Sequence, residues 1–283
     1  MDHIDEFESM FRRAERELFQ FADIPCQSIA FITDQSAEET RRRLSSVQKF
    51  LTSLGGGVQW HAITGDQYSN VAELLSRIDE QQLDLIVTYR HLQEESLVPQ
   101  HSLGVYLDVL TQTTSIPVLV LPGTAAVPKP LGDGRCDRTM VVADHISGDN
   151  RLINYGALLT PDNGQLWLCH VEDDAIFERY MDAIEKIPEI DTSVARELLE
   201  ATLLKAASDF IGSCIGELKK ARGSITYESR VARGHFLKQY TELIQDAGID
   251  ILVTNTKDED QLAMHGMAYS LSVELVEIAM LLL

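Results

Sequence analysis

The sequence predicts an α/β fold built from two doubly wound parallel sheets, and three observations support this prediction. Residues 64–88 and residues 233–254 are two copies of one unit, in which a glycine precedes an amphipathic helix and a buried strand. Continuous apolar runs alternate with helical patterns, as in parallel sheets covered on both faces. Residues 122–137 hold three of the eight prolines and three glycines, which is the composition of an interdomain linker. We therefore expect one domain over residues 1–121 and a second over residues 138–283.

The two copies of the repeated unit match in detail. Gly65 corresponds to Gly234, and each copy ends in Asp followed by an apolar strand, "DLIVT" or "DILVT". Both helices have apolar residues at positions i, i+3, i+4 and i+7. These are Val71, Leu74, Leu75 and Ile78 in the first copy and Tyr240, Leu243, Ile244 and Ala247 in the second. The glycines are expected to serve tight turns between strand and helix rather than to contact a ligand.

The first half contains four predicted strands. An amphipathic helix is expected over residues 4–22, and a second helix ends near residue 54. Two further helices separate the later strands. The predicted strands are residues 28–34, 58–64, 84–89 and 116–122.

The second half contains five predicted strands and therefore has one more than the first. A short helix ends near residue 160, an acidic insertion covers residues 172–191, and a long helix runs from about 192 to 222. That helix has an apolar stripe long enough to cover one face of a sheet. The predicted strands are residues 139–144, 165–171, 225–231, 250–255 and 279–283.

Two alignments explain the missing strand of the first half. In the favoured one, Asp2, His3 and Ile4 repeat Asp144, His145 and Ile146, so that residues 28–34 form the second strand and the first would lie upstream. This alignment predicts either an open slot in the sheet or a domain that has closed around the gap. In the competing alignment, residues 28–34 form the first strand and the second strand is omitted.

The composition excludes several classes of function. A formal net charge of -20 opposes binding to nucleic acid, because that binding depends on neutralising phosphates. Four scattered cysteines indicate neither a disulfide framework nor a zinc site. The acidic N-terminus differs from a secretory signal, and no apolar run approaches the roughly 20 residues that span a bilayer. We therefore expect a soluble, cytoplasmic protein.

The order of elements, the glycine after the third strand, the "DLIV" strand and the "PVLVLP" ending closely resemble the universal stress protein family. The resemblance covers nearly the whole chain as a tandem pair. It implies a sheet of order 3-2-1-4-5 in each domain, with one strand missing from the first, and a ligand at the carboxyl ends of the strands. It also implies pairing through the fifth strands, and we expect residues 116–121 and 279–283 to meet within one chain. A homodimer is compatible with the resemblance, and so is a protein partner such as a membrane transporter.

Members of this family that bind ATP carry, after the fourth strand, Gly, two residues, Gly, nine residues, and then Gly with Ser or Thr. Glycine lets the backbone approach phosphate closely and point N–H groups at it. In this chain the same spacing falls on Asn255, Asp258, Ala268 and Tyr269, and the segment "DED" adds three carboxylates. In the first half it falls on Tyr89, Leu92, Ser102 and Leu103. Both loops lack the glycines, so we expect no ATP binding in the usual mode of the family.

Several residues remain candidates for a site. For the second half, the resemblance implies Asp144, His145, Val171, Gly234, Thr254, Asn255, Asp258, Ala268 and Tyr269 as ligand-binding positions. Asp144 is expected to have a structural role at the end of its strand, and the alternative is that it holds a nucleoside. The second domain would then be a sensor of AMP or ATP, which is the alternative function. In the first half, Arg90, His91 and His101 are expected to be solvated loop residues, and the alternative is that they form a site for a small anion. No metal and no cofactor are expected, and His145, His170 and His265 are expected to be hydrogen-bonded structural groups.

The acidic insertion at residues 172–191 has apolar residues at helical spacing. It is expected to be either a helix packed on its own domain or a docking segment for a partner. No nucleophile elbow, Walker loop, zinc-protease motif or Rossmann glycine pattern is present, so catalysis is not expected. The sequence therefore favours a regulatory or stress-response protein that acts through protein contacts or a small ligand.

Overall fold

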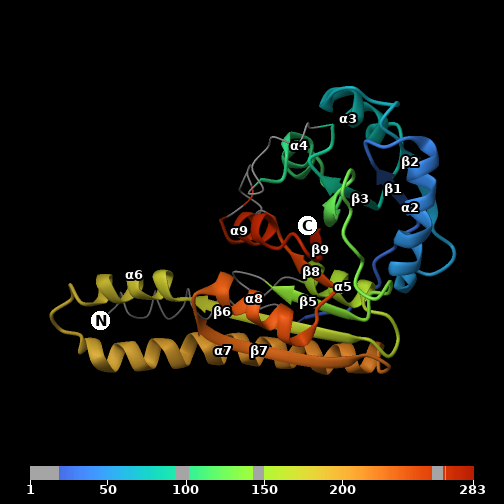
Figure 1. The fold of residues 1–283 in the computed structure, drawn as a ribbon. Coiled ribbons are helices and arrows are strands. Elements are labelled where there is room, and N and C mark those ends of the chain that lie inside the picture. The colour runs from blue at the N-terminus through green and yellow to red at the C-terminus, as the bar shows by residue number, and fades with distance from the viewer. Residues whose placement is uncertain (1–18, 94–101, 143–149, 257–263, 265) are drawn as a thin grey trace.

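The computed structural model describes residues 19–93, 102–142, 150–256, 264 and 266–283. Strands and helices alternate along most of the chain (Figure 1). The strands are β1 (Ser28–Ile32), β2 (Gln59–Ile63), β3 (Leu85–Arg90), β4 (Val118–Thr124), β5 (Arg138–Val142), β6 (Gln165–Asp173), β7 (Thr226–Gly234), β8 (Ile251–Thr254) and β9 (Ala279–Leu282). The helices are α2 (Ala37–Phe50), the 3-10 turn η1 (Thr52–Leu54), α3 (Val71–Asp79), α4 (Val105–Thr113), α5 (Asn150–Leu159), α6 (Asp174–Ile184), α7 (Thr192–Ala221), α8 (Phe236–Ala247) and α9 (Gly266–Glu274).

Polar side chains and a glycine define several helix ends. Ser36 caps α2, because its side chain accepts a hydrogen bond from the N–H of Glu39. Asn70 caps α3 in the same way through Glu73. Helix α8 ends at Gly248, whose φ of 61° lies in the left-handed region that glycine adopts most readily. The sequence therefore encodes these boundaries locally.

The nine strands form one sheet of order β2-β1-β3-β4-β9-β8-β5-β6-β7. In the second half, β7-β6-β5-β8-β9 matches the expected order 3-2-1-4-5, and its neighbouring strands are parallel. The two halves meet where β4 pairs with β9 in antiparallel register, with Val118 opposite Leu282 and Val120 opposite Met280. The prediction that these two strands pair within one chain is confirmed.

In the first half, β1 lies directly between β2 and β3. Ile29, Ala30 and Phe31 pair in parallel with residues 85–87 on one side, and β1 pairs with β2 on the other. The open slot is therefore wrong, since both edges of β1 are hydrogen-bonded. Unpaired N–H and C=O groups inside a sheet would be costly, and direct pairing of β1 with β3 removes that cost. This arrangement supports the competing alignment or closure around the gap. Residues 2–4, which carried the favoured alignment, lie outside the described residues.

Two apolar layers cover the two faces of the sheet. Helices α2, α5 and α7 pack on one face, and α3, α4, α8 and α9 pack on the other. Successive strand residues alternate between the layers, so that Ile29 and Phe31 enter the first and Ala30 and Ile32 enter the second. This burial on both faces explains why the strands appear in the sequence as continuous apolar runs.

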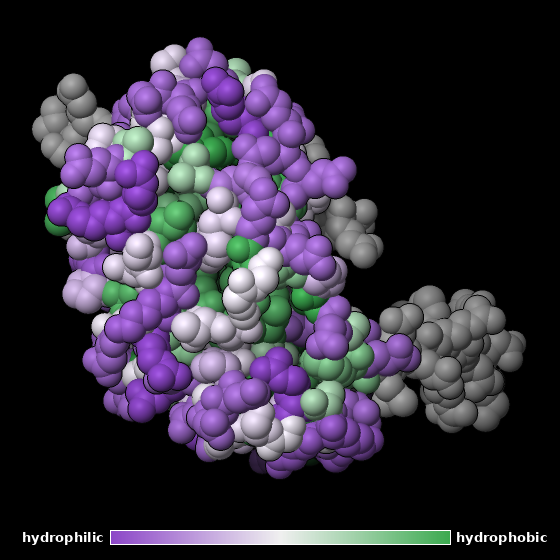
Figure 2. Space-filling view, turned by 90° about the vertical axis from the view of Figure 1, so that its right-hand side faces the viewer, coloured by the Kyte–Doolittle hydropathy of each residue, from purple (hydrophilic) through white to green (hydrophobic). Residues whose placement is uncertain are grey.

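The outer surface over α2 contrasts with these layers. Hydrophilic side chains cover most of the face shown in Figure 2, and apolar groups show mainly in the recesses between them. Among the described residues, no helix is long and apolar enough to cross a membrane.

Candidate functional site

The carboxyl ends of β5, β6 and β8 lie at one edge of the second half, where the sequence predicts a ligand. Asp144, His145 and Asp258 of the predicted set lie outside the described residues. Thr254 and Asn255 follow each other at the end of β8, and Thr254 is completely buried.

The chain after β8 is bonded to β9. The N–H of Thr256 donates to the carbonyl of Leu283 at 2.8 Å, and the N–H of Leu283 donates to the carbonyl of Thr254 at 3.0 Å. The hydroxyl of Thr256 donates to the same Leu283 carbonyl at 2.6 Å. These bonds extend the sheet, so the donors of this segment are used within the protein.

Ala268 and Tyr269 lie in the first turn of α9, which begins at Gly266. Ala268 is completely buried in the helix, whereas Tyr269 has 42% of its surface exposed. The phosphate-loop spacing therefore falls inside a helix here. Gly266 is at the start of this helix, but the glycine spacing of the ATP-binding members does not fall on it.

Gly234 ends β7 and lies next to the side chain of Gln239. A Cβ at position 234 would lie 1.9 Å from Nε2 of Gln239. That Nε2 donates a hydrogen bond to the carbonyl of Arg233 at 2.9 Å. The small residue leaves room for this side chain across the turn between β7 and α8.

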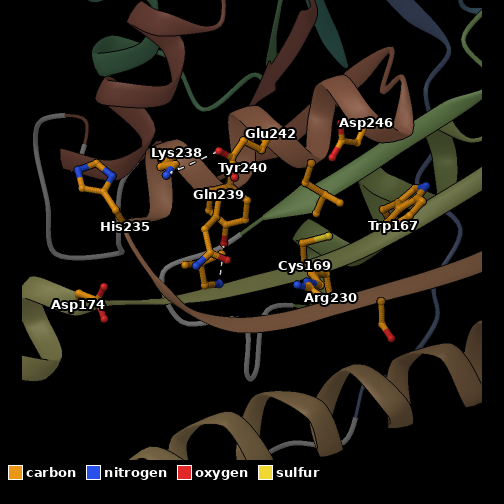
Figure 3. A pocket seen from close by; sticks show the side chains of 13 residues that line it. Trp167, Cys169, Asp174, Arg230, His235, Lys238, Gln239, Tyr240, Glu242 and Asp246 are labelled. Carbon is orange, nitrogen blue, oxygen red and sulfur yellow. Dashed lines mark hydrogen bonds and ion pairs between the residues drawn. The ribbon is translucent and has the colours of Figure 1, made fainter.

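A trough of about 790 Å³ lies between α8 and the exposed side of β6 and β7 (Figure 3). Strand β7 contributes Tyr227 and Val231 to the apolar layer beneath α7, whereas none of its described residues belongs to the layer on the α8 side. The sheet next to α8 is thus left open at its edge. The trough is lined by Trp167, Cys169, Val171, Asp174, Ser229, Arg230, His235, Lys238, Gln239, Tyr240, Glu242, Leu243 and Asp246.

The floor of the trough is buried and hydrogen-bonded. Tyr240 is completely buried, and its hydroxyl accepts a hydrogen bond from the N–H of Val171 at 2.9 Å. This bond holds α8 against β6 at the end nearest the predicted site. Cys169 is also completely buried, and burial raises the pKa of its thiol to about 12. The thiol is therefore protonated at neutral pH and is not an activated nucleophile.

The charged side chains of the trough include both signs, with two cations and three carboxylates. Trp167 lies at one end and His235 and Asp174 at the other, with Arg230 between them (Figure 3). Lys238 faces Glu242 at 3.9 Å on α8. The lining holds the cations Arg230 and Lys238 against the carboxylates of Asp174, Glu242 and Asp246. A triphosphate needs an excess of donors and positive charge, so the trough is better matched to a ligand that carries both charges.

Among the predicted positions, Val171 lines the trough and Gly234 adjoins it. Five further lining residues were not predicted from the sequence, namely Trp167, Arg230, Lys238, Glu242 and Asp246. One signal was present, because Lys238, Glu242 and Asp246 follow one another at intervals of four residues along the polar side of α8. Nothing local in the sequence indicated that this side borders an open strip of sheet.

The candidate anion site of the first half has a different environment from the one expected. Arg90 is 2% exposed, and its guanidinium donates to the carbonyls of Leu121, Ser272 and Leu275 at 3.0–3.3 Å. Burial lowers the pKa of Arg90 to about 10. These bonds join β3 to β4, to the last turn of α9 and to the residue that follows α9. A role for Arg90, His91 and His101 in binding an anion stays a prediction. His101 lies outside the described residues.

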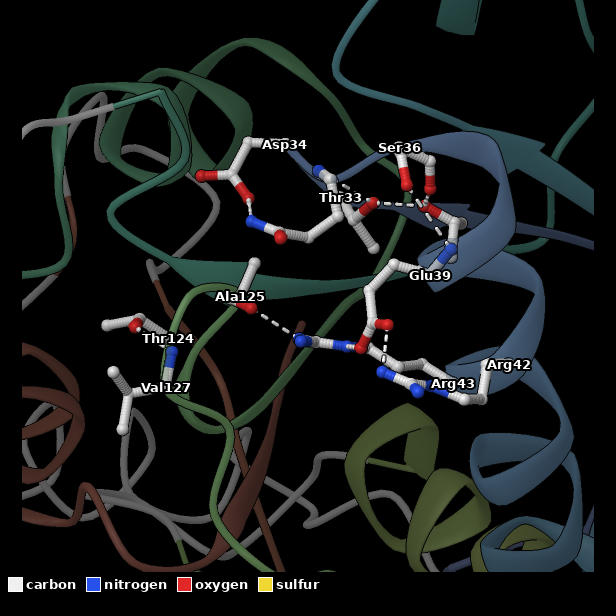
Figure 4. Close-up of polar contacts among 11 residues, drawn as sticks. Thr33, Asp34, Ser36, Glu39, Arg42, Arg43, Thr124, Ala125 and Val127 are labelled. Carbon is white, nitrogen blue, oxygen red and sulfur yellow. Dashed lines mark hydrogen bonds and ion pairs between the residues drawn. The ribbon is translucent and has the colours of Figure 1, made fainter.

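Polar groups at the carboxyl end of β1 are paired with one another (Figure 4). The hydroxyls of Thr33 and Thr40 are 2.6 Å apart, and Arg43 binds Glu39 at 2.7 Å. Arg43 also donates to the carbonyl of Ala125, just beyond β4. These contacts tie α2 to β4.

Metal-binding groupings were sought among the His, Cys, Asp and Glu side chains of the described ranges, and no cluster of three or more is present there. His170 is buried, with Nε2 3.6 Å from a carboxylate oxygen of Glu172. His145 and His265 lie outside the described residues.

Comparisons with known proteins agree with this architecture. A universal stress protein from Archaeoglobus fulgidus DSM 4304 superposes with a TM-score of 0.50 at 11% identity, over 92% of this chain and 98% of that one. The two proteins share a fold. A functionally unknown protein from Pseudomonas aeruginosa PAO1 superposes with a TM-score of 0.48 at 11% identity, over 91% of this chain and 92% of the other. No family model and no curated protein sequence match the chain.

Proposed function

We propose that this chain is a universal stress protein-like regulator that acts in the cytoplasm by binding a small polar ligand rather than by catalysis. The observation that carries the proposal is the trough beside α8. It has the volume of a small-molecule site, a buried and hydrogen-bonded floor, and charges of both signs at its walls. The fold shared with the Archaeoglobus fulgidus protein supports the regulatory role. Four free cysteines fit a reducing compartment.

MgATP is not the ligand in this proposal. The loop after β8 carries Asp258, Glu259 and Asp260 in the sequence, and each carboxylate repels a phosphate. We expect titration calorimetry of MgATP into the purified protein to show no stoichiometric site of micromolar affinity. Such a site would establish the alternative, an adenine-nucleotide sensor in the second half of the chain.

Native mass spectrometry of freshly purified protein identifies the ligand. We expect a bound mass that the variant Arg230→Glu loses, because this change inverts the charge of an exposed wall residue without touching the core. The matched control is Arg41→Glu on α2, an exposed arginine outside the trough, which should retain the mass. Loss from both variants, or retention by both, would overturn the trough as the site.

A further inference from the structure

Exposed large apolar side chains are concentrated on one projecting element. We define the arm as residues 174–206, which comprise α6, the connecting turn and the first half of α7. Figure 1 shows these helices extending beyond the ends of β6 and β7. Six of the nine exposed large apolar residues of the described chain lie on the arm, with exposed fractions of 38–63%. They are Ile176, Tyr180, Ile187, Ile190, Val194 and Leu198, and we call them the arm stripe.

The arm is an ordered structure held at its base. Phe177 and Met181 of α6 are buried, and the guanidinium of Arg233 lies 4.4 Å from the centre of the Phe177 ring. Arg233 also pairs with Asp174 of α6 at 3.1 Å and with Glu200 of α7 at 3.2 Å. One residue of β7 thus contacts both helices.

A second set of contacts joins the two helices farther along the arm. Arg196 of α7 binds both carboxylate oxygens of Glu178 on α6, at 2.5 and 2.7 Å. Such a two-point contact has a defined geometry as well as a favourable charge. These contacts join α6 to α7 within the arm. The first 15 residues of α7 bury none of their side chains in the core.

The stripe does not face the core. Leu198 precedes the buried Ala207 by nine residues, which is about 2.5 helical turns, so it lies on the opposite side of α7. Val194 lies one turn before Leu198 on the same side. Exposed apolar side chains that are concentrated on one element are typical of a binding site for another macromolecule.

The charge of the arm selects the kind of partner. The arm contains eight acidic and four basic residues, a net charge of -4. A second acidic arm would be repelled, whereas a basic amphipathic helix would bury its apolar side on the stripe and place its cations beside the carboxylates. We propose that the arm docks a basic amphipathic helix of another protein. This inference is independent of the ligand in the trough.

A pair of synthetic peptides provides the probe. One is a 20-residue amphipathic helix of leucine and lysine, and the other replaces each lysine with glutamate. We expect fluorescence anisotropy with the full chain to show salt-dependent binding of the first peptide only. Val194→Ser/Leu198→Ser should weaken this binding at least tenfold. The control Val105→Ser/Val127→Ser removes two exposed apolar side chains outside the arm and should bind like the parent.

Several outcomes would contradict the inference. Equal binding by both double variants would show general attraction of a basic peptide to an acidic protein. A dimer that sedimentation detects in the parent, and that the arm variant lacks, would assign the stripe to a second copy. Tighter peptide binding by Phe7→Ser/Phe11→Ser than by the parent would assign it to the chain's own N-terminal segment.

Discussion

At the residue scale, Gly65 shows how one missing side chain permits a close approach of two backbones. Its N–H donates to the carbonyl of Gln35 at 2.9 Å, which joins the turn after β2 to the turn after β1. A Cβ at position 65 would lie 2.2 Å from the backbone oxygen of Asp34. Since a backbone atom cannot rotate away, this contact requires glycine.

We therefore expect Gly65→Ala to lower the free energy of unfolding by about 3 kcal/mol, measured by urea denaturation. The matched control is Gly57→Ala, because no atom lies within 4 Å of a Cβ built at Gly57. The control should change the free energy by no more than about 0.5 kcal/mol. A loss of stability of the same size in both variants would mean that the contact with the Asp34 backbone is not the cause.

Arg90 is a residue whose environment could not be predicted from the local sequence. From the sequence, Arg90 follows a strand and precedes two histidines, which is compatible with a solvated loop or with a small-anion site. In the structure its acceptors at Ser272 and Leu275 come from more than 180 positions away. Local sequence predicts that a side chain is charged, whereas the burial of that charge depends on distant carbonyls.

At the element scale, the helices and strands of the second half could be predicted well. The long helix expected at residues 192–222 is α7, and the last strand is β9. Their signals are local, namely an apolar stripe and a continuous apolar run. The trough could not be predicted, because it depends on which strip of sheet α8 leaves uncovered. For a related reason the sequence left open whether β1 pairs directly with β3, since closing a sheet is a property of the packed state.

The start of α7 gives a pH-dependent prediction. Asp191 caps the helix by accepting hydrogen bonds from Ser193 and from the N–H of Val194. These bonds, the Ser193 hydroxyl first, hold the pKa of Asp191 below its usual value. A lowered pKa adds stability above the pKa of the unfolded chain, and this stability is lost as the pH falls through the lowered pKa.

We expect Asp191→Ala to reduce the hydrogen-exchange protection of residues 194–200 at pH 7, because the helix loses its cap. The difference from the parent should shrink as the pH is lowered toward 3. Asp191→Asn is the control, since its amide oxygen remains an acceptor but does not titrate. A difference between Asp191→Ala and the parent that stays constant over this range would exclude a role for the carboxylate charge.

At the scale of the whole molecule, the pairing of β4 with β9 makes one sheet out of two halves. Deleting Leu281, Leu282 and Leu283 would remove most of the partners of β4 and leave its edge unpaired. Exposed strand edges invite pairing with other chains. We expect this variant to aggregate at concentrations where the parent is monodisperse, as measured by light scattering.

The control for the deletion is Leu281→Ala, which keeps the backbone pairing of β9. It should lose about 3 kcal/mol of stability, because Leu281 is completely buried, without gaining a tendency to aggregate. A deletion variant that stays monodisperse would show that β4 does not depend on β9 for its protection.

Because β4 and β9 are antiparallel, the strands of the two halves of the chain run in opposite directions. The strands of each half are parallel among themselves. The single reversal at this pair therefore turns the carboxyl ends of β1 and β3 toward one side of the molecule and those of β5 and β8 toward the opposite side. A site at the carboxyl ends of the strands of one half would therefore not overlap a site at those of the other half, so binding at one would leave the other accessible.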